Sequence, residues 1–178
     1  MGKAKSFSTL QEAIQQIGAD KILVDEIKEL LTVLIDKNDF IEKPIELPFT
    51  HPLYMHSRYT REPTLAAFGL STFESKSSNR EGVATINDKN LELLLVTLNK
   101  SEADYSPSTL YQDYAISNYV FHWQSQNSAR PDYGKGKTYV EQAENGKRVL
   151  LFVRGQNDDE YGNTIGYIFL GEANYLEH

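Results

Sequence analysis

Aromatic and amide side chains gather in one stretch of the sequence, residues 105–127. It contains four of the eleven tyrosines, the only tryptophan and one of the four histidines. It ends in Gln124, Ser125, Gln126 and Asn127, whose side chains both donate and accept hydrogen bonds. Aromatic faces beside amide groups suit a flat ligand with polar edges, such as a nucleobase. The same composition is also typical of a core strand that leads into a polar turn, and the sequence leaves both interpretations open.

The first interpretation predicts a base-reading surface edged by cations. Aromatic rings stack on bases, amides can bind a base edge through two hydrogen bonds, and arginines bind phosphate oxygens. The residues expected to read a base are Tyr111, Tyr114, His122, Trp123, Gln124 and Gln126. The residues expected to contact the backbone or to complete the pocket are His56, Arg58, Tyr59, Arg61 and Arg154.

Two histidines, His56 and His122, are the residues that a metal site would use. No pair of histidines has the H-x-x-H or H-E-x-x-H spacing of common zinc sites, and the chain has no cysteine. We therefore predict no metal and no cofactor. A metal-dependent nuclease that uses these two histidines with a nearby carboxylate stays open as a further alternative.

Nucleophilic and phosphate-binding motifs are the remaining candidates for chemistry. Ser106 and Ser125 lack the G-x-S-x-G elbow of a catalytic serine, and Pro107 after Ser106 indicates a helix start. Gly134-Lys-Gly-Lys137 is not a Walker A loop, and we expect an exposed polar turn there. The sequence thus predicts no catalytic residue and no enzyme activity for this chain.

Composition limits the kinds of partner. Of the 178 residues, 40% are hydrophobic and 24% are charged, which is typical of a globular protein with its own core. No apolar run approaches the roughly 20 residues that cross a bilayer, and no signal peptide is recognisable, so we expect a cytoplasmic protein without a membrane partner. The net charge of −7 opposes binding that depends mainly on phosphates. Nucleic acid would have to be held through its bases or by a local basic patch. The oligomeric state is not predicted.

Two helices are expected at the N-terminus, over residues 8–17 and 20–36, from the spacing of their apolar residues. Asp20 is the expected N-cap of the second helix. The short link between them predicts an antiparallel helical hairpin.

A change of composition after the second helix predicts a domain boundary. Prolines recur every four residues within the connector 37–52, which favours an extended chain. We assign residues 1–44 to the hairpin and its linker and residues 45–175 to a second domain. Residues 176–178 resemble the start of a polyhistidine tag.

The second domain is predicted to be rich in strands. The strands are expected at 82–86, 91–99, 118–124, 149–154 and 166–170, with short helices at 61–69 and 108–115. Residues 93–98 are nearly all apolar, so their strand should be buried on both faces. Because helices and strands do not alternate regularly, we predict an α+β fold with a mainly antiparallel, β-barrel-like domain.

Several short sequence segments, taken in their order along the chain, resemble those of one known family. They are Pro52-Leu-Tyr-Met-His-Ser-Arg-Tyr-Thr-Arg-Glu62, Leu94-Leu-Val-Thr-Leu-Asn-Lys-Ser-Glu102, Tyr105-Ser-Pro-Ser-Thr-Leu-Tyr-Gln-Asp-Tyr-Ala-Ile-Ser117 with Phe121-His-Trp-Gln-Ser-Gln126, and Leu150-Leu-Phe-Val-Arg154 with Phe169-Leu-Gly171. Over about residues 50–175 the chain is similar to the uncharacterised domain at the C-terminal end of bacterial DEAD/DEAH-box helicases. Those proteins often also carry a phospholipase-D-like nuclease domain.

The resemblance implies an accessory domain of a DNA helicase in restriction or phage defence. The ATP-binding and helicase motifs would lie upstream, so the helicase core would be one partner and DNA the other. The family's domain has no assigned activity. By analogy, small barrels of the PUA and SRA kind hold a modified or flipped base between aromatic rings. The expected function is therefore non-catalytic recognition of nucleic acid; the alternative is a protein–protein or interdomain docking module with the same aromatic strand in its core.

Overall fold

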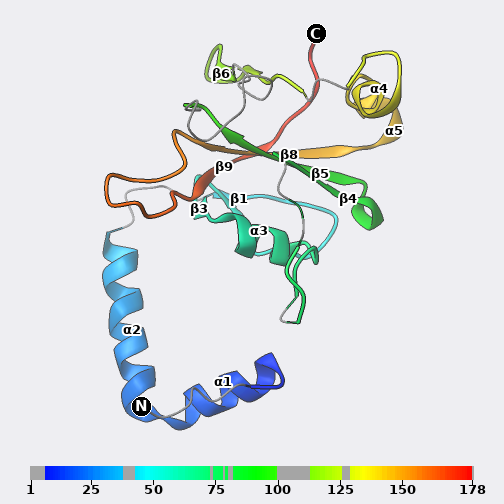
Figure 1. Cartoon of the computed structure of the whole chain (residues 1–178). Helices are drawn as coiled ribbons and strands as arrows, with labels where there is room; N and C mark the ends of the chain where they lie inside the picture. Colours follow the sequence, from blue (N-terminus) through cyan, green and yellow to red (C-terminus); the bar gives the residue numbers. More distant parts are fainter. Residues whose placement is uncertain are drawn as a thin grey trace. The chain divides into compact units, whose positions relative to one another are not determined.

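The computed structural model of the chain describes residues 7–37, 43–72, 74–77, 79, 82–99, 113–125 and 129–177. These residues form two compact units. One unit contains the N-terminal helices, and the other contains the sheet and the remaining elements, which Figure 1 colours by position in the sequence.

The N-terminal unit contains the two expected helices, α1 (Leu10–Ala19) and α2 (Lys21–Asp36). Both begin at a side-chain cap. The Thr9 hydroxyl accepts a hydrogen bond from the backbone N–H of Glu12 at 3.1 Å. Asp20 caps α2 as predicted, because its carboxylate accepts a backbone N–H of the first turn, also at 3.1 Å.

The expected packing of these helices into a hairpin is not found. Neither helix contains a buried residue, and the apolar side chains of both stripes are exposed. The single linking residue, Asp20, brings the helix ends together, but it does not fix the angle at which the helices leave the turn. The prediction of the helices was right, and that of their mutual packing was wrong.

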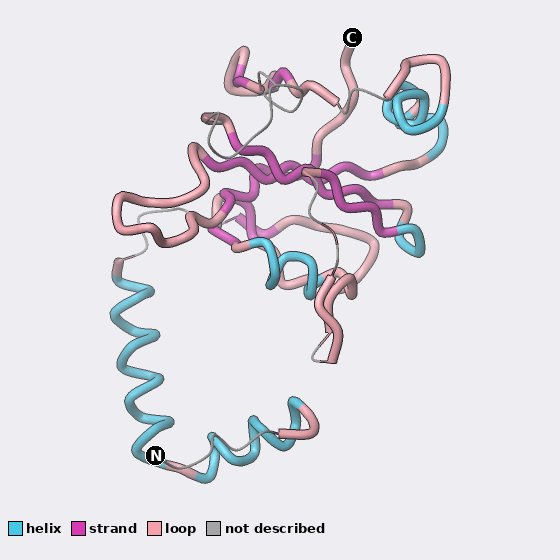
Figure 2. Tube along the Cα trace, in the orientation of Figure 1, coloured by secondary structure: helices cyan, strands magenta, loops and turns pink. Residues whose placement is uncertain are grey.

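A five-stranded sheet organises the second unit. Its strands are β3 (Arg58–Tyr59), β9 (Tyr167–Glu172), β8 (Arg148–Arg154), β5 (Leu91–Thr97) and β4 (Val83–Ile86), in this spatial order. The neighbours β5 and β8 run parallel, and every other neighbouring pair is antiparallel. Figure 2 shows these strands crossing the centre of the unit, with helices and loops around them.

The remaining elements are short. They are β1 (Lys43–Pro44), which pairs with β2 (Tyr54–Met55), β6 (Tyr114–Ala115), which pairs with β7 (Phe121–His122), the helices α3 (Arg61–Ala67), α4 (Gly134–Val140) and α5 (Gln142–Asn145), and a 3₁₀ turn at Asn87–Lys89.

Alternating side chains of the central strands build two apolar clusters, one on each face of the sheet. On β5, Leu91, Leu93 and Leu95 belong to the first cluster, which also contains residues of α3 and its C-terminal end. Leu94 and Val96 belong to the second cluster. Every residue of β5 is buried, as predicted from its apolar sequence.

The predicted α+β class is confirmed, but the predicted barrel is not found. Within the described residues the sheet is open, with β3 and β4 at its two edges. The parallel pair of β5 and β8 was not foreseen, because about fifty residues separate these strands and no regular helix crossover marks the connection.

Two local predictions were wrong. The turn expected at Gly134–Lys137 is the start of α4, where Gly136 is buried against the backbone of Arg130. Tertiary packing at that glycine overrides the low helix propensity of glycine-rich sequences. A helix was expected over 108–115, but Tyr114 and Ala115 form a strand, and residues 108–112 lie outside the described part of the chain.

Candidate functional site

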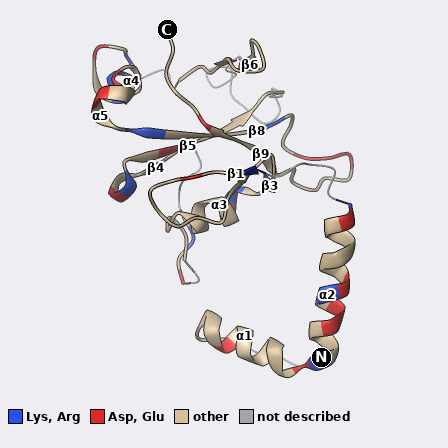
Figure 3. Ribbon diagram, turned by 180° about the vertical axis from the view of Figure 1, so that it is seen from behind, with Lys and Arg blue, Asp and Glu red and all other residues tan. Residues whose placement is uncertain are grey.

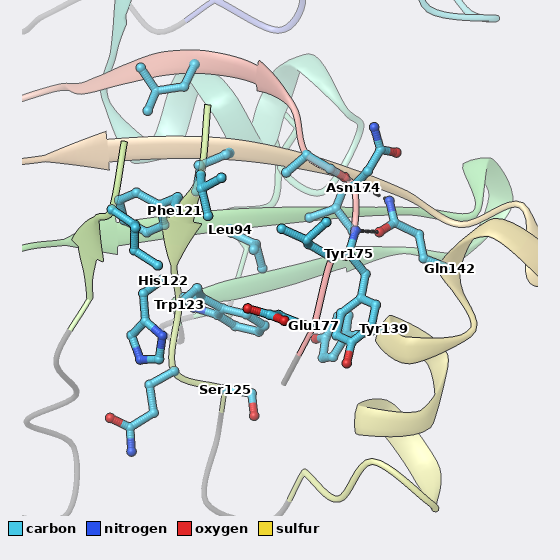
Figure 4. Close-up of a pocket in the computed structure, with 18 of the residues that line it drawn as sticks. Leu94, Phe121, His122, Trp123, Ser125, Tyr139, Gln142, Asn174, Tyr175 and Glu177 are labelled. Carbon is cyan, nitrogen blue, oxygen red and sulfur yellow. Dashed lines mark hydrogen bonds between the residues drawn. The ribbon is translucent and has the colours of Figure 1, made fainter. Parts of the chain in front are cut away.

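A cleft with a volume of about 930 Å³ lies on one face of the sheet. Its lining comes from the sheet, the β6–β7 hairpin, the α4–α5 region and the segment that follows β9. Figure 4 shows the labelled side chains converging from these elements.

The floor of the cleft is apolar because of the strand alternation. Leu94 of β5 and Val149 and Leu151 of β8 point to the same face and are buried in the second apolar cluster. Phe121 and Trp123 pack against that cluster from the β7 side. A ligand in the cleft therefore meets hydrocarbon beneath it and aromatic rings beside it.

Aromatic side chains of His122, Trp123 and Tyr139 form one wall. The rings of Trp123 and Tyr139 meet edge to face, with centroids 5.3 Å apart, and Figure 4 shows them approaching from β7 and α4. The rings of Tyr114 and His122 stack with centroids 4.8 Å apart and planes inclined by 28°. Because the Trp123 and Tyr139 rings touch, a planar ligand would stack on an outer face of this pair and would not enter between the two rings.

Gln142 fixes a second wall of the cleft, the segment that follows β9. Its side chain is 6% exposed, and its amide bridges the segment after β9. The Nε2 group donates to the carbonyl of Ala173 at 2.8 Å, and Oε1 accepts the backbone N–H of Tyr175 at 2.7 Å. These bonds hold residues 173–175 alongside α5, as the dashed line in Figure 4 shows for Tyr175.

We expect Gln142→Met to release this wall. Methionine fills a similar volume but cannot replace either hydrogen bond, so the variant loses two part-buried hydrogen bonds, at a cost of about 1–3 kcal/mol in total. Hydrogen exchange at the Tyr175 amide should speed up while exchange in β5 stays unchanged. Glu144→Met, on the exposed side of α5, is the control. Equal protection at Tyr175 in both variants would show that the bridge is unimportant.

Charge is sparse in the cleft. Among the lining residues of the described chain, the formally charged side chains are those of Arg130, Glu172 and Glu177. Glu172 is paired with Arg148 at 2.8 Å. Figure 3 shows acidic and basic positions interspersed over this unit and not gathered into one basic stripe. The cleft thus suits a ring with polar edges better than a phosphate.

Three of the predicted base-reading residues, His122, Trp123 and Gln124, line this cleft. Trp123 is partly buried, whereas His122 and Gln124 are exposed. The backbone N–H of Gln124 donates to the carboxylate of Asp113 at 2.9 Å, which fixes the direction of the chain after β7.

The other three residues that were predicted to read a base are not among the described residues that line the cleft. Tyr114 contributes through its stack on His122, without lining the cleft itself. Tyr111 and Gln126 lie outside the described residues.

The arginine–tyrosine group near residue 58 is not among the described residues that line the cleft. Tyr59 packs edge to face on Phe152 in the first apolar cluster, with centroids 6.5 Å apart. His56 has a φ of 72°, and its backbone N–H donates to Phe169 at 2.7 Å. Arg61 donates to the side chain and to the backbone carbonyl of Asn79.

Arg58 lies opposite Ile168 in the register of β3 and β9, so their side chains share a sheet face. Arg58 is exposed, and it stands at the edge of the sheet.

Arg154 lies on the sheet face opposite the cleft. Its guanidinium is 4.3 Å from the ring centroid of Tyr167, which belongs to the first apolar cluster. It donates to the Thr97 hydroxyl at 3.0 Å, to the carbonyl of Ile165 at 3.0 Å and to the Asn157 side chain at 2.7 Å. These bonds tie the loop between β8 and β9 to the sheet, so Arg154 acts as a structural anchor in this arrangement.

The sequence interpretation missed part of the site. Tyr139, Gln142 and Asn174 line the cleft and were not named as candidates. Tyr139 lies two residues after a glycine-rich segment that was expected to be a turn, and only its position on α4 brings it to Trp123. The sequence contains no signal for this pairing.

No group that could hold a metal ion is formed by three or more histidines, aspartates or glutamates within the described ranges. His56 and His122 do not share a site there, since only His122 lines the cleft. In the same ranges, no helix combines the length and apolar content needed to cross a membrane.

A comparison with family models finds one match. Residues 53–178 match the model described as "Domain of unknown function (DUF3427)". Comparisons with curated proteins and with solved structures find no significant match.

Proposed function

We propose that this chain, which belongs to the family described as a domain of unknown function (DUF3427), is a non-catalytic module that binds nucleic acid through an unstacked base. The base would occupy the cleft beside Trp123 and Tyr139. The single observation that carries the proposal is the cleft itself, which combines an apolar floor, an aromatic wall and few charges.

Stacking on the Trp123–Tyr139 pair would supply most of the affinity. Every base has a flat face, and stacking on an aromatic side chain contributes about 1–3 kcal/mol per base. The edge-to-face contact holds both rings in one orientation before a ligand arrives, so little side-chain entropy is lost on binding.

Amide and hydroxyl groups around the cleft would bind the polar edge of the base. Gln124, Ser125 and Asn174 line it and carry both donors and acceptors. A base whose pairing edge is occupied in a duplex could not use them. The cleft is therefore expected to prefer single-stranded, flipped or damaged nucleotides over intact duplex.

The net charge of −7 agrees with this mode of binding. A protein that binds mainly through phosphates is usually basic, because phosphate neutralisation supplies most non-specific affinity. We infer a domain that recognises a base at close range, while a DNA helicase in the same parent protein supplies contact with the phosphate backbone. The domain would have an accessory role in restriction or phage defence in the cytoplasm. It would recognise a base as PUA and SRA domains do, but on an open sheet.

Binding of labelled oligonucleotides, followed by fluorescence anisotropy, tests the proposal. The ligands are single-stranded DNA, the matching duplex, and single strands with methylated or hydroxymethylated cytosine, all at low salt. We expect saturable binding of single strands and weaker binding of duplex. Tyr139→Leu should weaken binding by about 5- to 150-fold, because it removes a stacking surface while keeping apolar volume.

Tyr161→Leu is the matched control, because Tyr161 is 81% exposed and does not line the cleft. Equal affinities of the two variants would contradict the assigned site. Absence of binding to every ligand at low salt would overturn the proposal for this chain and would favour a protein-docking role for the cleft.

A further inference from the structure

The apolar side of α2 is uncovered along the whole helix. Leu23, Ile27, Leu30 and Leu34 are 39%, 37%, 60% and 55% exposed, and α2 contains no buried residue. A helix of this length is marginally stable in water unless its apolar side is packed. Of the nineteen large hydrophobic side chains exposed in the described chain, eleven lie between residues 10 and 35, so the excess is confined to this unit.

The spacing of these four residues is that of a coiled-coil seam. They follow one another at intervals of four, three and four, which keeps them on one side of a slightly underwound helix. Three residues before Leu23 and three after Leu34, the seam ends in charges, Asp20 and Lys37. Figure 3 shows the charged positions of α2 between longer uncharged stretches.

The sequence of α2 is nearly symmetric about its centre. With its two capping residues included, it begins Asp20-Lys-Ile-Leu-Val24 and ends Val33-Leu-Ile-Asp-Lys37. Counted inward from the two ends, Ile22 corresponds to Ile35, Leu23 to Leu34 and Val24 to Val33. The charged ends are inverted, so that Asp20 corresponds to Lys37 and Lys21 corresponds to Asp36.

This symmetry specifies an antiparallel partner with the same sequence. When α2 pairs with a second α2 in the opposite direction, Leu23 lies level with Leu34 of the partner subunit, and Ile27 lies level with Leu30 of the partner subunit. Asp20 then faces Lys37 of the partner subunit at each end of the seam. A parallel pair would instead place aspartate beside aspartate and lysine beside lysine, which is unfavourable.

We propose that two copies of this chain associate through an antiparallel, two-fold symmetric pairing of α2. The pairing is isologous. Leu23 of one protomer contacts Leu34 of the partner subunit, and Leu34 of that protomer contacts Leu23 of the partner subunit. It buries the seam in both copies and places opposite charges at both ends. The interface lies in the helical unit and does not depend on what the cleft binds.

Sedimentation or light scattering on the purified chain gives the first test. We expect twice the mass of one chain at concentrations near 100 µM. Leu30→Glu should weaken the dimer at least about a hundredfold, because it places two unpaired charges in the seam. Thr32→Glu, which adds the same charge on the polar side of α2, should leave the dimer intact. An unchanged near-ultraviolet signal from Trp123 would show that both variants keep the folded sheet unit.

Disulfide cross-linking gives the direction of the pairing. The chain has no cysteine, so each introduced cysteine is unique. An equimolar mixture of Leu23→Cys and Leu34→Cys should form the mixed disulfide dimer under oxidising conditions. Each variant by itself should not cross-link, because equal positions lie about 16 Å apart along an antiparallel pair, beyond disulfide reach.

Two results would overturn the proposal. One is a monomer at every concentration up to about 100 µM, which would assign the apolar side of α2 to another part of the protein. The other is efficient cross-linking of Leu23→Cys with itself, which requires a parallel pair. Failure of the nucleic-acid-binding test would not affect the dimer proposal. Failure of the dimer test would likewise not affect the proposed binding of nucleic acid.

Discussion

Arg154→Met is expected to lower the free energy of unfolding by about 2–3 kcal/mol and to leave the affinity of the folded cleft unchanged. The guanidinium of Arg154 serves Thr97, Asn157 and Ile165 and lies over the ring of Tyr167. Methionine keeps the aliphatic stem but removes every donor, so these acceptors lose the hydrogen bonds from Arg154. Urea unfolding measures the loss, with the slope of the transition as a check on two-state behaviour.

Arg148→Met on the same strand is the matched control. Arg148 forms an ion pair with Glu172, in which both side chains are about a third exposed. An exposed ion pair contributes about 0–1 kcal/mol, so this variant should remain close to the parent chain. If Arg154→Met instead kept full stability and lost nucleic-acid binding, Arg154 would be a ligand-binding residue, and ligand would bind on the sheet face opposite the cleft.

Gly136→Ala is expected to have an effect of similar size on the cleft side. A Cβ atom at Gly136 would lie 2.2 Å from the backbone oxygen of Arg130 and 2.6–2.7 Å from two further backbone atoms of Arg130. Backbone atoms cannot move aside as a side chain can, so α4 or the segment at Arg130 must shift, at a cost of about 1–3 kcal/mol. The shift should also loosen Tyr139 against Trp123.

Gly155→Ala is the control for the added methyl group, since no atom lies within 4 Å of a Cβ at that position. Urea unfolding gives the stability of both variants, and nuclear Overhauser contacts between Trp123 and Tyr139 report on the wall. Equal stability of the two variants with an intact contact would show that α4 does not depend on the close approach at Gly136.

The elements with strong local patterns could be predicted from the sequence. The capped, periodic helix α2 and the fully apolar strand β5 form as expected, because short-range periodicity and burial determine them. The parallel pairing of β5 with β8 could not be predicted. It depends on a long connection whose path is set by packing and not by a local motif.

The candidate site could be predicted only where its residues are neighbours in sequence. His122, Trp123 and Gln124 were identified from their composition, and all three line the cleft. Tyr139 lies on α4 and Gln142 on α5, and the sequence predicted a turn at the residues where α4 begins. The sheet face of Arg154 depends on the register of β8, which composition does not reveal.

The emission of Trp123 reports on base stacking in the cleft, because Trp123 is the only tryptophan of the chain and lines the cleft. Unlabelled single-stranded DNA is titrated into the unmodified chain at low and at moderate salt, with duplex of the same sequence as the comparison. Base stacking in the cleft predicts saturable quenching by the single strand, with a salt dependence that corresponds to only about one or two phosphates. An emission that stays constant while anisotropy shows binding, or quenching that is equally strong with duplex, would contradict base recognition in this cleft.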